Sequence, residues 1–166
     1  MVKEKDLYPI IMQKFSGLFK SKGYQIHLEI TADKKFSNKL KSVIPDNQQI
    51  IFYFLKEVAP DITGFFKGRY NTYLVVIEVK DEKIRLDHIY QMKKYADLFG
   101  AKFAFLVSTE EIPEEIKRLT KSIYSILSTP SPYQARVLVY FDEEAQDFRD
   151  WHPENPFTQE YYWEYT

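Results

Sequence analysis

Hydrophobic positions along the first thirty residues follow a helical spacing and then a strand spacing. Apolar side chains recur three or four positions apart over residues 5–21, which predicts an amphipathic helix. Gly23 is expected to end it. Residues 24–30 then alternate between apolar and polar, which predicts a strand. The side chains expected to face inward are those of Ile26, Leu28 and Ile30.

The rest of the chain continues as alternating strands and helices. The run 50–55 fits either a helix or a strand. The resulting order, α-β-β-β-α-β-α-β, predicts an α/β protein with a mixed central sheet flanked by helices. Strands are expected at 61–66, 73–80, 102–108 and 135–141, and helices at 83–99, closed by Gly100, and 113–127.

The composition limits which classes of protein and which kinds of metal site are possible. The length of 166 residues predicts one domain. The chain has no cysteine, which excludes disulfides, Cys-ligated zinc and iron–sulfur clusters. It shows neither a signal-peptide pattern nor an apolar run long enough to cross a bilayer, so we expect a cytoplasmic protein without a membrane partner. The three histidines, His27, His88 and His152, lack the spacing of metal ligands.

Acidic and basic residues are distributed unevenly along the chain. Residues 142–166 hold eight acidic residues and one basic residue, whereas residues 1–141 hold 22 basic and 16 acidic residues. A mildly basic body is compatible with nucleic acid. We therefore expect a domain over 1–141 and an acidic, aromatic C-terminal extension over 142–166 that packs on the domain or on a partner protein. The lysine-rich segment 33–41 is expected to be an exposed loop that either contacts phosphates or is simply solvated.

Two short motifs carry the candidate chemistry. Pro60-Asp61 precedes one expected strand, and Glu78-Val79-Lys80 ends the next. Residues two apart in a strand share a face, so Glu78 and Lys80 point the same way and Val79 points into the core. If the two strands pair antiparallel through a turn at 67–71, Asp61 approaches Glu78 across the ladder.

Two carboxylates beside a lysine are suited to metal-assisted cleavage of a phosphodiester. Mg²⁺ prefers oxygen ligands, which Asp61, Glu78 and the carbonyl of Val79 can supply. Lys80 can then orient the attacking water or offset charge in the transition state. On spacing alone, Glu78 and Lys80 also fit ordinary exposed residues at the end of a strand.

The following helix adds two polar residues on one face. Gln91 and Tyr95 are four apart and thus one turn above the other, with Asp87 and His88 before them. A glutamine side chain carries a donor and an acceptor, and it can bridge a metal-bound water and a phosphate. A solvated glutamine and a packing tyrosine are the alternative interpretation.

Together these motifs resemble the PD-(D/E)XK nuclease superfamily, the restriction-endonuclease-like fold. The Gln-x-x-x-Tyr element is similar to that of RecB-type exonucleases, and the resemblance covers about residues 5–109. It implies an αβββαβ core, a nuclease-like domain over 1–141, and Mg²⁺ or Mn²⁺ bound by Asp61 and Glu78. It further implies that Lys80 is the catalytic lysine, supported by Gln91 and Tyr95. The acid that many members carry on the first helix is left open among Glu4, Asp6 and Glu29.

The expected function is a Mg²⁺-dependent nuclease that hydrolyses DNA and leaves a 5′-phosphate and a 3′-hydroxyl, as the resemblance implies. The alternative is a catalytically silent or partner-dependent module that binds nucleic acid within an assembly. Two-fold symmetric cutting of both strands of a duplex would require a homodimer. The sequence does not distinguish DNA from RNA, or an exonuclease from an endonuclease.

Overall fold

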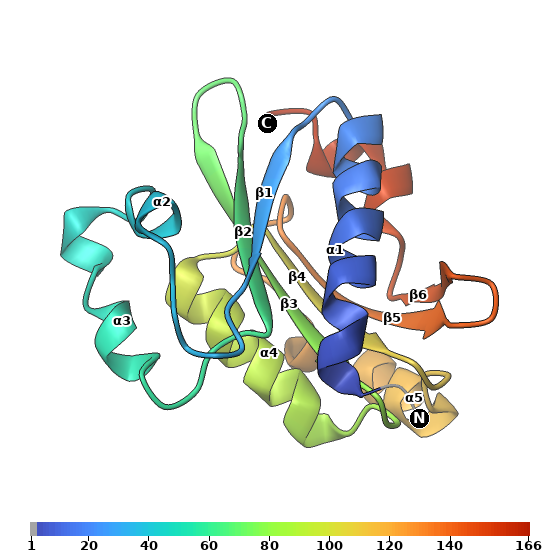
Figure 1. Cartoon of the computed structure of the whole chain (residues 1–166). Coiled ribbons are helices and arrows are strands. Elements are labelled where there is room, and N and C mark those ends of the chain that lie inside the picture. The colour runs from blue at the N-terminus through green and yellow to red at the C-terminus, as the bar shows by residue number, and fades with distance from the viewer. Residues whose placement is uncertain (1–2) are drawn as a thin grey trace.

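A computed structural model describes residues 3–166 as an α/β fold built on one open, mixed sheet (Figure 1). The six strands lie in sequence order, and helices cover both faces of the sheet. The strands are β1 (Ile26–Ile30), β2 (Ile62–Lys67), β3 (Thr72–Lys80), β4 (Phe103–Ser108), β5 (Ala135–Asp142) and β6 (Asp147–His152). The α-helices are α1 (Glu4–Ser21), α2 (Asn38–Lys41), α3 (Ile51–Phe54), α4 (Leu86–Phe99) and α5 (Glu114–Ser122). Short 3₁₀ turns occur at η1 (Asp46–Gln48), η2 (Tyr124–Ile126), η3 (Pro156–Thr158) and η4 (Glu160–Tyr162).

Strand direction changes across the sheet. β1, β2 and β3 pair antiparallel, β3, β4 and β5 pair parallel, and β6 returns antiparallel to β5. The parallel steps need long crossovers, which α4 and α5 provide. In the β2–β3 ladder Ile62 lies opposite Ile77, so the residues just beyond this pair, Asp61 and Glu78, come together.

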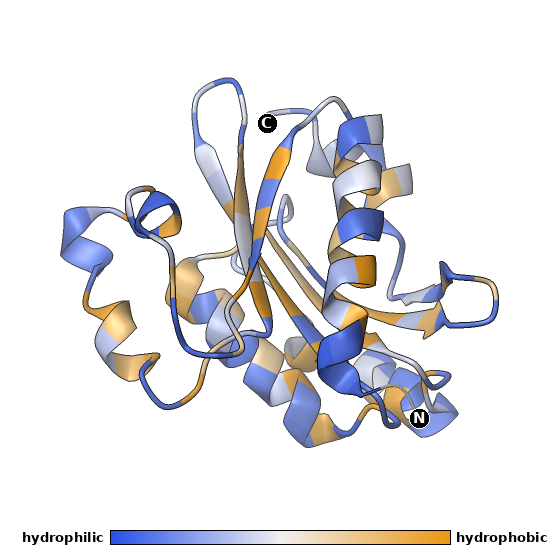
Figure 2. Cartoon of the chain, viewed as in Figure 1, coloured by the Kyte–Doolittle hydropathy of each residue, from blue (hydrophilic) through white to orange (hydrophobic). Residues whose placement is uncertain are grey.

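The sheet separates two hydrophobic layers. On β3, Val75, Ile77 and Val79 pack with α1 and the C-terminal segment, whereas Leu74 and Val76 pack with α2, α3, α4 and α5. Figure 2 shows the central strands as mostly hydrophobic, as expected for strands covered on both faces. The α1 layer is rich in rings that contact one another in pairs; its members include Phe15, Phe19, Phe103, Phe105, Phe157 and Trp163.

The structure confirms the α/β class, the first helix and the five predicted strands, with some boundaries shifted. The helix predicted from residue 83 begins at Leu86, because the backbone N–H of Arg85 donates to His88 Nδ1 (3.0 Å) and caps the first turn. The helix predicted to reach residue 127 ends at Ser122, since Ile123 leaves the helical conformation and a 3₁₀ turn follows.

Other expectations are corrected or resolved. Ile30 does not face inward: its side chain is 43% exposed, because β1 is an edge strand and Ile30 ends it. The ambiguous run at 50–55 forms the single helical turn α3. The segment 33–41 is exposed apart from Leu40, which anchors α2 in the core, and Phe36, which is half-buried against the same hydrophobic layer.

The C-terminal segment was not predicted to contain a strand. Residues 147–152 form β6, and Phe157, Tyr162 and Trp163 are buried in the α1 layer. This segment therefore packs on the domain and closes one side of its core.

Among residues 3–166, no helix is both long enough and apolar enough to cross a membrane.

We expect Gly64→Ala to destabilise the fold. A Cβ at Gly64, in the middle of β2, would lie 2.1 Å from the backbone oxygen of His27, so β1 would have to move. A loss of about 2 kcal/mol or more in the free energy of unfolding is expected from chemical denaturation. Gly17→Ala is the matched control, because nothing lies within 4 Å of a Cβ there, and a gain of up to about 1 kcal/mol is expected. Equal stability of Gly64→Ala and the wild type would contradict the close packing of β1 on β2.

Candidate active site

The two predicted carboxylates are fixed by a reciprocal pair of backbone hydrogen bonds. The N–H of Asp61 donates to Glu78 Oε1 (2.8 Å), and the N–H of Val79 donates to Asp61 Oδ2 (2.8 Å). The β2–β3 register produces this arrangement, because Asp61 and Glu78 follow the Ile62–Ile77 pair. Each carboxylate therefore keeps a second oxygen that accepts no backbone hydrogen bond within residues 3–166.

The N-terminal end of α1 completes the group. Glu4 Oε1 lies 3.9 Å from Lys80 Nζ, and both side chains are partly exposed. Tyr8, one helical turn after Glu4, is buried, and its hydroxyl interacts with Asp61. Tyr8 was missed from the sequence. Its spacing of four from a candidate acid was the available signal.

Of the three candidate first-helix or first-strand acids, only Glu4 reaches this group. Asp6 instead accepts a hydrogen bond from the backbone N–H of Lys3 (3.3 Å). Glu29 is engaged on β1, where it bonds His27 Nε2 (2.8 Å) and the backbone N–H of Ser37 (2.9 Å).

Burial makes ionisation of these carboxyls unfavourable. Desolvation raises the pKa of Glu78 and of Asp61, and the charge of Asp61 raises that of Glu78 further. Burial, together with Asp61, raises the pKa of Glu4 to about 7. Lys80 is the cation that lowers all three pKa values. Three carboxyls thus share one lysine, and the cluster would be stabilised by further positive charge.

Helix α4 brings the two predicted supporting residues to the same place. Gln91 Nε2 donates to the hydroxyl of Tyr95 (3.4 Å), and Tyr95 is fully buried. Burial raises the pKa of Tyr95 to about 12, with a further contribution from the charge of Glu78. The Tyr95 hydroxyl therefore stays protonated at neutral pH, close to the carboxylate pair.

A shallow depression opens beside the carboxylate pair, and it is lined by Glu4, Lys80 and Gln91 but not by Asp61 or Glu78. It connects α1, the end of β3 and the first half of α4, and it has a volume of about 590 Å³. Its lining is mostly charged or polar: Glu4, Lys80, Glu82, Arg85, Asp87, His88, Tyr90, Gln91 and Lys94. The structure thus brings the predicted residues Asp61, Glu78, Val79, Lys80, Gln91 and Tyr95 together at one end of the sheet.

The donor set at this end suits a hard divalent cation. The oxygens of Asp61 and Glu78 that accept no backbone hydrogen bond, and the carbonyl of Val79, are oxygen donors, as Mg²⁺ and Mn²⁺ prefer. Within residues 3–166, no three His, Cys, Asp or Glu side chains already converge on one metal position. A cation would rest on two carboxylates, a backbone carbonyl and waters, a set that Mg²⁺ commonly accepts.

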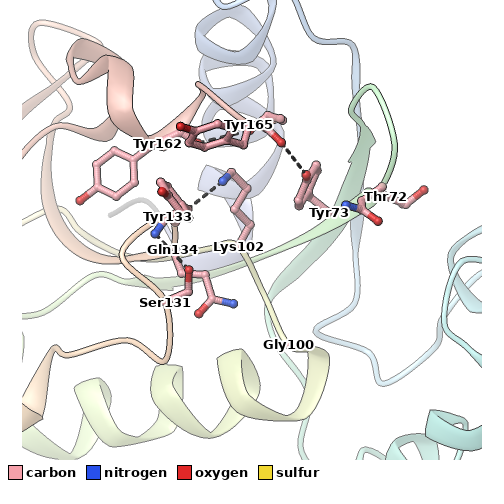
Figure 3. A pocket seen from close by; sticks show the side chains of 11 residues that line it. Thr72, Tyr73, Gly100, Lys102, Ser131, Tyr133, Gln134, Tyr162 and Tyr165 are labelled. Carbon is pink, nitrogen blue, oxygen red and sulfur yellow. Dashed lines mark hydrogen bonds between the residues drawn. The ribbon is translucent and has the colours of Figure 1, made fainter.

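A second pocket lies at the opposite end of the strands (Figure 3). There Lys102 Nζ donates to the carbonyl of Tyr133 (2.8 Å) and lies 5.1 Å from the ring centre of Tyr73. Burial lowers the pKa of Lys102 to about 8. None of the eleven residues that line this pocket has an acidic side chain.

Comparison of the chain with protein-family models, with curated proteins and with solved structures found no match.

The stability of the metal-free protein should fall as pH rises. A carboxyl whose pKa is higher in the folded chain binds more protons when folded, so the free energy of unfolding decreases between the unfolded and folded values. For Glu4 this interval runs from 4.5 to about 7, and Glu78 acts in the same direction. Glu78→Gln keeps the acceptor for the Asp61 N–H. It should melt at a higher temperature than the wild type above neutral pH and show a shallower pH dependence.

Addition of Mn²⁺ in the same thermal melts tests the cation. The wild type should gain thermal stability with Mn²⁺, whereas Glu78→Gln should gain little, because one ligand is lost. Glu115→Gln removes an exposed carboxylate on α5 and should behave as the wild type. Identical pH and Mn²⁺ responses in Glu78→Gln and Glu115→Gln would contradict the assignment.

Proposed function

We propose that this protein is a cytoplasmic, Mg²⁺-dependent nuclease with a restriction-endonuclease-like core that hydrolyses phosphodiester bonds of DNA. The observation that carries the proposal is the reciprocal pairing of Asp61 with Glu78 and Val79, with Lys80 on the same face as Glu78. Support also comes from Gln91 and Tyr95, which the fold brings to the same end of the sheet.

The cation would be held by Asp61, Glu78 and the Val79 carbonyl. When bound, it would neutralise charge on the phosphate and lower the pKa of a water molecule. The paired backbone hydrogen bonds fix both carboxylates before any ligand arrives, so little reorganisation is needed when they bind it.

Lys80 is suited to act on the substrate itself. Its side chain is 20% exposed and lines the depression, so its ammonium group can reach a phosphate oxygen or the attacking water. Glu4 lies beside it, and a pKa of about 7 lets this carboxyl accept or release a proton at neutral pH.

Gln91 and Tyr95 act as positioning residues. The Tyr95 hydroxyl is protonated and close to Glu78, which restricts where that carboxylate can point. Gln91 bonds Tyr95 and also lines the depression, where its amide can orient a water or a phosphate oxygen.

Cleavage of labelled DNA in Mg²⁺, Mn²⁺ or EDTA tests the proposal. Asp61→Asn and Glu78→Gln should abolish metal-dependent cutting, and Lys80→Met should lower kcat by about 10²-fold or more, since a charge stabiliser in the transition state is lost. Lys83→Met is the matched control, because Lys83 is exposed and close in sequence, and it should retain activity.

Two results would overturn the proposal. Cutting that survives Asp61→Asn and Lys80→Met would place the activity elsewhere or in a contaminant. A wild type that binds Mn²⁺ but cuts no DNA or RNA would favour the catalytically silent or partner-dependent nucleic-acid-binding module instead.

A further inference from the structure

A groove of about 480 Å³ lies between the segment after β1 and helix α3. We call it the lysine–aromatic groove, because its lining consists of Lys34, Lys35, Phe36, Lys41, Phe52, Tyr53, Leu55 and Lys56. No acidic residue lines it. Within residues 3–166, none of its four lysines has a carboxylate oxygen within ion-pair distance. The groove therefore concentrates four lysines that form no ion pair in the described part of the chain, and the Asp33 carboxylate beside them accepts a hydrogen bond from the backbone N–H of Lys35 (3.1 Å).

Aromatic rings accompany that charge. Tyr53 is 64% exposed, and Phe54 packs edge-on against it with ring centres 5.2 Å apart. Lys56 Nζ lies 5.2 Å from the centre of the Tyr53 ring. Helix α3 also appears strongly hydrophobic in Figure 2, although it lies at the periphery of the fold. An exposed ring beside lysines is the combination with which proteins bind single-stranded nucleic acid.

Both walls of the groove are tied to the candidate active site. The N–H of Thr31 donates to the carbonyl of Asp61 (2.8 Å), and the Thr31 hydroxyl donates to the carbonyl of Pro60 (2.6 Å). Lys34 and Lys35 follow within four residues on one wall. The other wall, α3, leads through residues 55–60 to Asp61, and Figure 1 shows both connections running along the same end of the sheet.

We propose that the lysine–aromatic groove binds a single strand of the substrate nucleic acid and directs it to the carboxylate pair. The lysines contact backbone phosphates, and Tyr53 stacks on an unpaired base. In a duplex the faces of the bases are covered by their neighbours, so an exposed ring gains most from a single strand. This inference rests on the proposed nuclease function, and it adds that the substrate is a single strand of nucleic acid.

Binding is measured separately from cleavage. Fluorescence anisotropy of a labelled oligothymidine and of a hairpin duplex, both in EDTA, gives affinity without turnover. Tyr53→Ala should weaken binding of the single strand about 5- to 150-fold, and it should affect the duplex little. Lys34→Gln combined with Lys35→Gln should reduce the slope of log K against log salt by about 1.4 for the single strand.

Matched controls are available elsewhere on the surface. Tyr70 and Tyr124 are 83% and 81% exposed, so Tyr70→Ala and Tyr124→Ala remove comparable rings outside the groove. Lys14→Gln with Lys121→Gln removes two exposed lysines outside it. All four substitutions should leave affinity for the oligothymidine unchanged.

Three results would overturn the inference. The first is an equal loss of affinity for the oligothymidine in Tyr53→Ala and Tyr124→Ala, and the second is equal or tighter binding of the duplex by the wild type. The third is a Tyr53→Ala variant that binds the oligothymidine as the wild type does but loses self-association. The last would make α3 a contact between copies of the chain. A failure of the proposed nuclease function can be told apart from a failure of the proposed groove. Tyr53-dependent binding without cleavage would retain the groove and reject the enzyme, whereas cleavage unaffected by Tyr53→Ala would retain the enzyme and reject the groove.

Discussion

The candidate site depends on one structural constraint, the register of β2 against β3. The Ile62–Ile77 pair ends the ladder, and beyond it the backbone N–H groups of Asp61 and Val79 donate to carboxylates rather than to strand carbonyls. A shift of one residue would turn Glu78 to the other face of the sheet, against α1. The same hydrophobic alternation that buries Val79 therefore also orients the two carboxylates, and core packing and site geometry cannot vary independently.

That geometry has an energetic consequence. Asp61, Glu78 and Glu4 all have raised pKa values because they are partly or fully removed from water, and Lys80 is the cation that opposes this effect. Such a cluster lowers the stability of the metal-free fold at neutral pH. The rigid hydrophobic layers on both faces of the sheet compensate for it, and they hold the carboxyls close together despite their mutual repulsion.

The sequence was informative where the relevant interactions are local or periodic. Alternation predicted the strands and the shared face of Glu78 and Lys80, and a spacing of four predicted that Gln91 and Tyr95 lie on one face of α4, where they form a hydrogen bond. It did not predict β6. It predicted that the aromatic C-terminal extension packs on the domain or on a partner, but not which residues Trp163 contacts, because partners such as Phe19 and Phe103 lie far away along the chain. Tyr8 was missed for the same reason, since only the folded structure brings α1 to the start of β2.

In the folded chain, the acidic C-terminal segment and the lysine–aromatic groove lie on opposite faces of the sheet. The acidic C-terminal segment packs through Phe157 and Trp163 into the layer beneath α1, and Glu160 pairs with Lys22 there (2.9 Å). The lysine–aromatic groove is instead anchored by Leu40 and Leu55 in the opposite layer. The acidic C-terminal segment and the groove lysines are thus attached to opposite faces of the sheet. A polyanion would be attracted to the face with the groove. One of the segments that form this groove bonds Asp61 through Thr31, and the other leads along the chain to Asp61.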